Sequence, residues 1–464
     1  MKTLSLITLF VVGATTLLAD DPRLAKSSRE DRNGWIYVHL EGTPGEIGFQ
    51  HGYLVAPEID EMLRMYAFYF QGSLKKEWSF FREAAERMFW PKLDKEYQEE
   101  IQGIVEGLKA RGYSYDHIDI TALNGNIELA SYYLPYLANK IKADSMNNRA
   151  PGYCSAFIAT GSATADGKIV IAHNNWSEYI IGQRWNVIAD IVPAKGRHIL
   201  MDCIPGFIHS GDDFAINDAG LLYTETTITQ FKGFDEKGVP EFMRARKAAQ
   251  YGESIDDFVR IMKTGNNGAY ANDWLVGDTK TNEIARVELG LKNTRVWRTF
   301  DGIYVGSNFA SDETLIKEET TFDPKNAASS PNARKRRWEQ IVDQYKGKLN
   351  EDLARQFEGD HFDAIAGKEQ KNRCVICGHN DLDPLGTAEF SWPPFFPAGA
   401  VQGKITTAAL AKDMKIWARM GHPCGDDFLA QPFFELHPEF AWQGKFLRDM
   451  KGQPWTMFEA KGKR

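Results

Sequence analysis

Apolar residues recur with two different periods along this chain, and the change falls near residue 152. Between residues 56 and 143 the period is that of helices with one apolar face. It is clearest in four residues, Ile101, Ile104, Val105 and Leu108. Further helical stretches are expected at 58–69, 76–89 and 118–141. Pro135 should kink or break the last of them, and Ile36 to Leu40 predict a short strand ahead of the helices.

Beyond residue 152 short alternating runs are separated by turn residues, which is typical of hairpins. Ser155–Thr160 and Ile169–His173 flank Asp166-Gly167, a strong hairpin signal. Three further pairs follow the same pattern: Phe214–Ile216 with Leu221–Thr226, Trp274–Gly277 with Ile284–Leu289, and Arg295–Arg298 with Ile303–Gly306. Helical stretches are expected between them at 241–251, 254–264 and 333–347. The pattern predicts mainly antiparallel sheets with helices packed on their outer faces.

The start of the chain has the three-part pattern of a secretory signal. Lys2 is followed by an almost wholly apolar run from Leu4 to Leu18, and Ala19 precedes Asp20. We expect a signal peptide at 1–19, cleavage after Ala19, and a secreted or periplasmic protein without a transmembrane segment. The alternative is a short membrane anchor, although the apolar run falls short of the roughly 20 residues that a span needs.

Composition and charge argue against one class of partner, nucleic acid. Of the 464 residues, 43% are apolar and 25% charged, with a net charge of -8. This is the composition of a folded globular protein, and its acidic balance argues against nucleic acid as a partner. The basic run from Arg334 to Arg337 is expected to be a solvated helix face.

The five cysteines leave several arrangements open. They are Cys154, Cys203, Cys374, Cys377 and Cys424. An odd count leaves at least one thiol unpaired, and that thiol is a candidate reactive group; the other four could form two disulfides or stay reduced. Cys374 and Cys377, with His379 nearby, look like half of a zinc site, but no second pair has suitable spacing. Neither a metal nor a cofactor is therefore expected.

Cys154 has an unusual place, at the start of a predicted strand directly after a loop. If the chain turns at Asp166-Gly167, Cys154 lies opposite residues 175–179. The polar run His173-Asn174-Asn175-Trp176 then comes close to the thiol. Taken singly, Cys154 could be a buried small hydrophobe and His173 a structural histidine; together they indicate a site.

Cleavage of the Tyr153–Cys154 peptide bond would give Cys154 a free α-amine. Such an amine has a pKa of about 8 and could accept the proton of its own residue's thiol. Nucleophile and base would then belong to one residue. Asparagine amides and backbone N–H groups could stabilise the oxyanion.

The residues around this hairpin resemble the phospholipase B-like proteins, which are N-terminal-nucleophile (Ntn) hydrolases. The resemblance rests on blocks in matching order: Cys154-Ser155-Ala156, Ala172–Tyr179, Pro205-Gly206, Ser210–Phe214, Gly220-Leu221, Glu225–Ile228, Gly268–Trp274, Asn380-Asp381-Leu382 and Gln431-Pro432-Phe433. The N-terminal run 42–52 is similar to that of the penicillin N-acyltransferase-like autoproteolytic proteins. The resemblance implies an α+β fold, a four-layer αββα sandwich with two mainly antiparallel sheets. It also implies a mainly helical N-terminal segment, 20–153, ahead of a catalytic domain, 154–464.

The same resemblance implies roles for particular residues. Cys154 would be the nucleophile and, through its amine, the base. His173 or Asn174 would orient the amine or the substrate. Asn272 would donate to the oxyanion, unless it caps a turn, and Thr227 would face the same pocket. Trp176 and Asp213 are candidates for substrate contacts, with a structural turn as the alternative for Asp213.

Three functions remain open on the sequence. The first is an autoproteolytic hydrolase or acyltransferase acting on N-acyl compounds, made as a zymogen. The second is a phospholipase B-like or lysophospholipase ester hydrolase, and the third is an unprocessed binding protein. The partner would be a small-molecule or lipid acyl substrate, and the two fragments of the chain are expected to stay associated. Dense aromatic residues at 390–396 and 433–455 could line a lipid groove or simply pack in the core.

Overall fold

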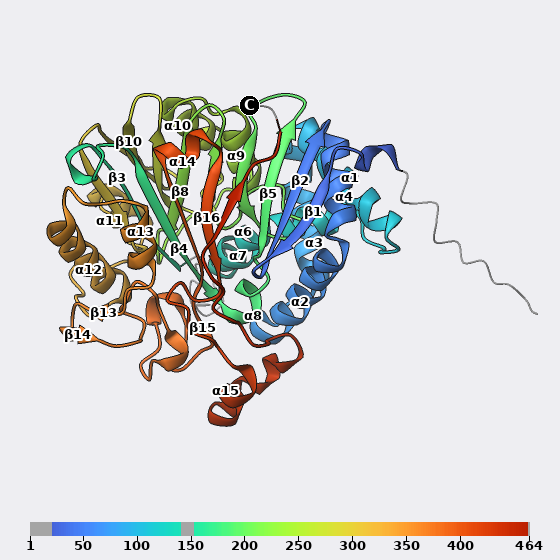
Figure 1. Ribbon diagram of the computed structural model, residues 1–464. Helices are drawn as coiled ribbons and strands as arrows, with labels where there is room; N and C mark the ends of the chain where they lie inside the picture. Colours follow the sequence, from blue (N-terminus) through green and yellow to red (C-terminus); the bar gives the residue numbers. More distant parts are fainter. Residues whose placement is uncertain (1–20, 141–152, 463–464) are drawn as a thin grey trace, which may run out of the picture.

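The chain folds into four layers, helices on either side of two stacked sheets (Figure 1). The computed structural model describes residues 21–140 and 153–462. The predicted signal peptide at 1–19 lies outside the described residues. The α+β sandwich with large antiparallel sheets confirms the expected fold class.

The larger sheet has nine strands in the order β1-β2-β5-β6-β7-β8-β9-β10-β11. Their bounds are β1 Ser28–Arg32, β2 Trp35–Gly42, β5 Val187–Pro193, β6 Ile199–Cys203, β7 Phe214–Asn217, β8 Leu221–Thr227, β9 Asn272–Asp278, β10 Glu283–Leu289 and β11 Thr294–Thr299. All neighbours are antiparallel except β2 and β5, which run parallel.

The smaller sheet has six strands in the order β12-β3-β4-β15-β16-β17, all antiparallel. Their bounds are β3 Tyr153–Thr160, β4 Val170–Glu178, β12 Gly302–Gly306, β15 Ala398–Thr407, β16 Lys415–Met420 and β17 Thr456–Glu459. A separate two-stranded ribbon is formed by β13, Phe362–Asp363, and β14, Lys368–Glu369. The hairpin of β3 and β4, which carries the predicted nucleophile, thus lies inside the smaller sheet rather than at its edge.

The two sheets meet through an apolar layer. Ala156 and Ile158 of β3 and Ile171 of β4 pack there against residues of the larger sheet such as Leu222 and Leu275. The intervening positions of β3 and β4 point the other way, as the period of two along a strand requires. Phe157 and Ala172 accordingly pack against the outer helices α12, Ser330–Tyr345, and α13, Glu351–Glu358.

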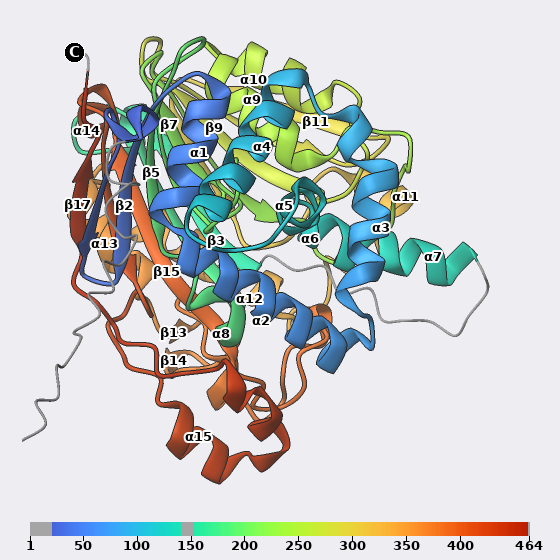
Figure 2. The ribbon, with the colours of Figure 1, turned by 90° about the vertical axis from the view of Figure 1, so that its right-hand side faces the viewer.

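The opposite outer layer, on the larger sheet, is built mainly by N-terminal helices, which Figure 2 shows at the front of the molecule. They are α1 Pro44–Leu54, α2 Ala56–Leu74, α3 Trp78–Met88, α4 Lys95–Ala110, α5 His117–Asn124, α6 Asn126–Glu128, a π-helical turn Leu129–Tyr133 and α7 Leu134–Lys140. Two later helices join them, α9 Glu241–Tyr251 and α10 Ile255–Lys263. Pro135 lies in the first turn of α7, where its missing N–H is tolerated.

The remaining helices are short or peripheral. They are α8 Tyr179–Gly182, α11 Glu313–Glu319, α14 Ala408–Lys412 and α15 Ala430–Leu436. Short 3-10 turns complete the elements at Pro22–Leu24, Trp90–Lys92, Gly161–Ala163, Asn380–Leu382, Ala388–Phe390 and Pro438–Lys445. Within the described ranges, no helix combines the length and the apolar character that a membrane span requires.

Glycines let α1 and α4 pack with their backbones in contact. A Cβ at Gly48 would lie 1.9 Å from the carbonyl oxygen of Glu100, and one at Gly52 would lie 2.1 Å from that of Ile104. Gly103 and Gly107 of α4 face α1 in the same way. The pair is anchored at the start of α1 by a capping box between Thr43 and Glu46.

Two features differ from the expectations. The predicted hairpin between Arg295–Arg298 and Ile303–Gly306 is wrong: β11 pairs with β10 in the larger sheet, whereas β12 pairs with β3 in the smaller one. The turn at Asp301-Gly302 therefore carries the chain from one sheet to the other. The N-terminal segment also contributes two strands, and β2 pairs with β5 from Ile36↔Val187 to Gly42↔Pro193.

Candidate active site

The register of β3 and β4 places Cys154 directly opposite Asn175, within the range expected from the hairpin. The thiol Sγ lies 3.6 Å from Asn175 Oδ1. Cys154 is buried, with 1% of its surface exposed. The turn at Asp166-Gly167 thus brings Cys154, the second residue of β3, beside a polar side chain of the neighbouring strand.

The backbone nitrogen of Cys154 is held by a side chain from a distant part of the sequence. It donates to Asn308 Oδ1 at 3.1 Å, and Asn308 Nδ2 donates to the carbonyl oxygen of Thr227 at 2.9 Å. Arg334 donates to the Cys154 carbonyl oxygen at 2.6 Å and to Asn308 Oδ1 at 2.9 Å. Cys154, Thr227 and Asn308 therefore form one hydrogen-bonded group that joins the two sheets.

Arg334 is fully buried, so the interpretation of its basic run as a solvated face is wrong for this residue. Its guanidinium carbon lies 4.2 Å from the Trp176 ring centroid. Burial lowers the pKa of Arg334 to about 9. Through the Cys154 carbonyl oxygen and Asn308, Arg334 fixes the backbone of Cys154.

Asn175 is itself held by a buried polar chain. Its Nδ2 donates to Asp212 Oδ1 at 2.9 Å, and Asp212 Oδ2 accepts from Gln402 Nε2 at 2.7 Å. Lys404 Nζ donates to the Asp212 carbonyl oxygen and forms an ion pair with Asp202. The amide of Asn175 is thereby oriented with its oxygen toward the thiol.

His173 lies two residues from Asn175 on the same face of β4. Burial, aided by the charge of Lys404, lowers its pKa well below the usual range, so the ring is neutral. Among the described residues neither ring nitrogen has a hydrogen-bond partner. Ligand atoms of Cys154, His173 and Glu225 lie within 4.8 Å of one another.

Glu225 lies close to the thiol, and Tyr270 joins it to a second buried carboxyl group, Asp213. Tyr270 donates to Asp213 Oδ2 at 2.6 Å and lies 3.1 Å from Glu225 Oε1. Burial raises the pKa of Asp213 to about 6, and burial together with Asp213 raises that of Glu225 further. Burial and these two groups also raise the pKa of the Cys154 thiol. The pair therefore holds a proton near neutral pH and keeps the thiol protonated.

Asn272 begins β9 opposite Thr227 of β8. Its side chain is fully buried, and neither atom of the amide has a hydrogen-bond partner among the described residues. A buried amide without partners carries a cost of about 1–3 kcal/mol for each unsatisfied group. Asn272 and Thr227 thus lie at one end of the larger sheet, with Thr227 linked to Cys154 through Asn308.

Asn174 and Trp176 lie on the opposite face of β4 from the thiol. Asn174 Nδ2 donates to the carbonyl oxygens of Glu358 and Ile376, at 2.6 and 3.1 Å. Trp176 Nε1 donates to the same Ile376 oxygen at 3.0 Å. The structure therefore brings His173 and Asn175 toward Cys154 but directs Asn174 and Trp176 to the helical layer behind the strand.

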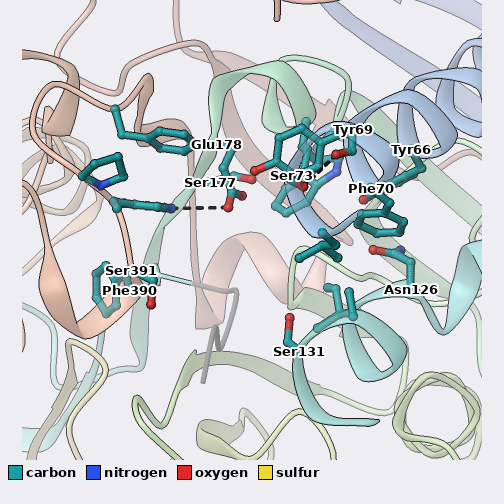
Figure 3. Close-up of a pocket in the computed structure, with 18 of the residues that line it drawn as sticks. Tyr66, Tyr69, Phe70, Ser73, Asn126, Ser131, Ser177, Glu178, Phe390 and Ser391 are labelled. Atoms are coloured by element: carbon teal, nitrogen blue, oxygen red, sulfur yellow. Dashed lines mark hydrogen bonds between the residues drawn. The ribbon is translucent and has the colours of Figure 1, made fainter. Parts of the chain in front are cut away.

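An apolar cavity of about 220 Å³ opens beside the end of β4 (Figure 3). Its walls come from helix α2, from the residues around α6, from the end of β4 and from the loop at 390–396: Tyr66, Tyr69, Phe70, Ser73, Leu74, Asn126, Ile127, Ala130, Ser131, Ser177, Glu178, Ile181, Trp185, Phe390, Ser391, Trp392, Pro393, Phe396 and Trp442. Glu178 Oε1 accepts a hydrogen bond from Trp392 across it. Cys154 does not line this cavity. The lining residue of β4 that is nearest in sequence to Asn175 is Ser177, two residues further along the strand.

Asn308, Arg334, Glu225 and Tyr270 were not assigned roles from the sequence. Glu225 and Tyr270 lie inside blocks that carry the family resemblance, so those blocks held a usable signal. Asn308 and Arg334 reach Cys154 from more than 150 residues further along the chain, and no local pattern indicates them.

A second group of metal-ligand side chains lies away from this site, formed by His361, Cys377, His379 and Cys424. All five cysteines are free thiols in the structure.

The fold and the site define a class of protein: a four-layer α+β sandwich with a cysteine at the start of a central strand, buried among polar groups. The family model for phospholipase B matches residues 58–352, more than half of the chain. The chain belongs to the phospholipase B family, which confirms the resemblance.

Curated relatives match parts of the chain at modest identity. An uncharacterized protein of Archaeoglobus fulgidus is 27% identical over 270 residues, 54% of this chain and 42% of that protein. A phospholipase B-like 2 protein of Bos taurus is 32% identical over 145 residues, 28% of this chain and 24% of its own. Phospholipase B-like 1 of Homo sapiens is 29% identical over 138 residues, 28% and 25% of the two chains. The matches thus span less than half the length of these relatives.

Proposed function

We propose that this protein is an exported hydrolase that breaks acyl bonds through Cys154, after its own chain has been cut before that residue. One observation carries the proposal: the nitrogen of Cys154 is already bound by Asn308, at 3.1 Å, while its thiol faces Asn175. Cleavage would turn that nitrogen into an amine beside the thiol without moving either group. The membership in the phospholipase B family supports hydrolysis as the reaction class.

Self-cleavage begins with attack of the Cys154 sulfur on the carbonyl carbon of Tyr153. The C–N bond breaks, the nitrogen takes the thiol proton and leaves as the α-amine, and a thioester remains. Water then attacks the thioester, which releases a carboxylate at Tyr153 and restores the thiol. The buried pair Asp213 and Glu225 holds a proton near neutral pH and can relay it between sulfur and nitrogen.

Substrate turnover repeats this chemistry on another molecule. The α-amine of Cys154, with a pKa of about 8, accepts the thiol proton, and the thiolate attacks the acyl carbonyl. The amine protonates the leaving alcohol or amine, and water releases the acid from the thioester. Asn272, whose buried amide has no partner among the described residues, would donate to the oxyanion, and each such donor contributes about 3 kcal/mol.

The cavity supports an acyl chain as part of the substrate. Its walls are mainly aromatic and aliphatic, and they suit an unbranched acyl chain. The expected N-acyl compound and the alternative, a lysophospholipid, both carry such an acyl chain and differ in the leaving group. The N-terminal signal pattern supports a reaction outside the cytoplasm.

The test compares two substrates with one acyl chain, an N-acyl amino acid and a lysophospholipid. We expect the cleaved protein to release fatty acid from at least one of them and to form a mass adduct of the acyl group on the chain that starts at Cys154. A Cys154→Ala variant should show neither. Release of fatty acid by that variant at the wild-type rate would overturn the proposal.

A further inference from the structure

Three separate segments bring four metal-ligand side chains to one point. His361 follows α13, Cys377 and His379 lie in the loop between β14 and β15, and Cys424 follows β16. One ligand atom from each lies within 4.8 Å of the other three. The loop that carries β13 and β14 is drawn in orange at the lower left of Figure 1, beside the end of β15.

The distances between the ligand atoms fit a tetrahedron around one ion. His361 Nε2 and His379 Nε2 are 3.1 Å apart, and the sulfurs of Cys377 and Cys424 lie 3.8 and 3.7 Å from His379 Nε2. Zinc bonds of about 2.0–2.3 Å in tetrahedral geometry put neighbouring nitrogen and sulfur ligands about 3.3–3.8 Å apart. The three separations that involve His379 are therefore close to the spacing that the ion needs, and the remaining ligand atoms lie within 4.8 Å of one another.

We propose that His361, Cys377, His379 and Cys424 bind one structural zinc ion. Two histidines and two cysteines supply four protein ligands, as structural rather than catalytic zinc sites do. The sequence offered only Cys374, Cys377 and His379 as half of a site; the structure replaces Cys374 with two ligands from distant segments.

The surroundings of the group suit a metal site. Cys377 and His379 are buried, whereas His361 and Cys424 line an open surface pocket through which an ion can enter. His379 Nδ1 lies 4.0 Å from Asp381 Oδ1, and Asp381 accepts from Tyr179 at 2.7 Å. A carboxylate on the far side of a histidine ring is the usual outer partner of a zinc ligand.

The ion would hold in place the loop that packs against β4, the strand paired with the predicted nucleophile. Ile376, next to Cys377, accepts the hydrogen bonds of Asn174 and Trp176 through its carbonyl oxygen. A Cβ at Gly378, between the two ligands of that loop, would lie 2.2 Å from the Trp176 ring. A bound ion would thereby hold the loop at 376–379 against β4, which is the strand that pairs with Cys154.

The test measures metal in the full-length protein, purified without a histidine tag or chelator, by inductively coupled plasma mass spectrometry. We expect one zinc per chain, and Co²⁺ in its place should show the visible absorption of tetrahedral coordination with charge transfer from thiolate. Cys424→Ser and His361→Ala should each lose most of the metal. Cys374→Ser is the matched control, because this buried cysteine of the same loop lies outside the group, and it should keep the zinc.

Two results would overturn the proposal. One is a protein without zinc whose reduced form gives no tetrahedral spectrum with Co²⁺. The other is a Cys377–Cys424 disulfide in the purified protein, detected by alkylation and peptide mass without reduction. Both measurements use the wild-type chain, so they decide the matter even if a variant does not fold.

Discussion

At the scale of single residues, side chains from separate segments hold the backbone nitrogen and the thiol of Cys154. Its nitrogen and its thiol are bound by different asparagines, Asn308 and Asn175. Arg334 holds both its carbonyl and Asn308. We therefore predict that Asn308 positions Cys154, and that its loss disturbs the chemistry without removing any reacting group.

Replacing Asn308 by alanine should slow the cut before Cys154 by about 100-fold, because misplacing a reacting group by about 1 Å has an effect of this size. The measurement is the fraction of uncut chain over time, read by intact mass. Asn332→Ala is the control: this asparagine binds backbone carbonyls near the start of α12, and its loss should leave the rate unchanged. A wild-type rate of cleavage in Asn308→Ala would show that Asn308 does not position Cys154 for the cut.

Asp213 should make the stability of the protein depend on pH. Its folded-state pKa of about 6 lies above the ordinary value near 3.9, so the folded state binds the proton more tightly than the unfolded state. This contribution is fully present below about pH 4 and is lost as the pH rises through about 6. The free energy of unfolding should therefore fall across this window.

The measurement is urea unfolding at several pH values in an uncut Cys154→Ala background. Asp213→Asn should flatten the fall between about pH 4 and 6, where each unit of pKa shift corresponds to about 1.4 kcal/mol. If the free energy of unfolding falls equally steeply with and without Asp213→Asn, other groups cause the fall.

At the scale of elements, local patterns predicted strands and turns well but not all of their partners. The Asp166-Gly167 hairpin and the pairs β7–β8 and β9–β10 formed as expected. The turn at Asp301-Gly302 has the same local chemistry and yet joins two different sheets. The period of a strand reports which face is buried, and it does not report which neighbour completes the sheet.

Contact between the backbones of α1 and α4 gives a prediction at this scale. Gly52→Ala should lower the free energy of unfolding by roughly 1–3 kcal/mol, because its Cβ would overlap the Ile104 carbonyl. Gly45→Ala, in the same helix, meets nothing within 4 Å and should be neutral or stabilise by up to about 1 kcal/mol. Urea unfolding of the two variants checks this, and equal destabilisation would contradict the close packing.

At the scale of the whole molecule, the N-terminal segment is built into the sandwich. It supplies β1 and β2 to the larger sheet, α1 and α4 to the outer layer, and much of the cavity wall through α2. The sequence indicated its helices and the strand at 36–40. The parallel pairing of β2 with β5 could not be predicted, because it joins segments about 150 residues apart.

The two fragments should therefore stay together after the cut. We expect one peak in gel filtration under native conditions and two bands in denaturing gels, with separation only when denaturant unfolds the sheet. Two peaks under native conditions would contradict the continuous sheet.

Some residues of the candidate site could be predicted from the sequence, and others could not. Hairpin geometry placed Cys154 beside the polar run of β4, and the period of two explains why His173 and Asn175 face the thiol while Asn174 and Trp176 do not. Asn308, Arg334 and the zinc ligands come from segments that only the complete fold brings together. Sequence patterns are local, so they do not predict which residues of distant segments meet in one site.

The intact mass of the purified protein shows directly whether the peptide bond before Cys154 is cut. The account predicts that wild-type material contains a chain beginning at Cys154, and that Cys154→Ala yields one continuous chain. An active wild-type protein that is never cut, or a Cys154→Ala variant that is cut at the same bond, would contradict it.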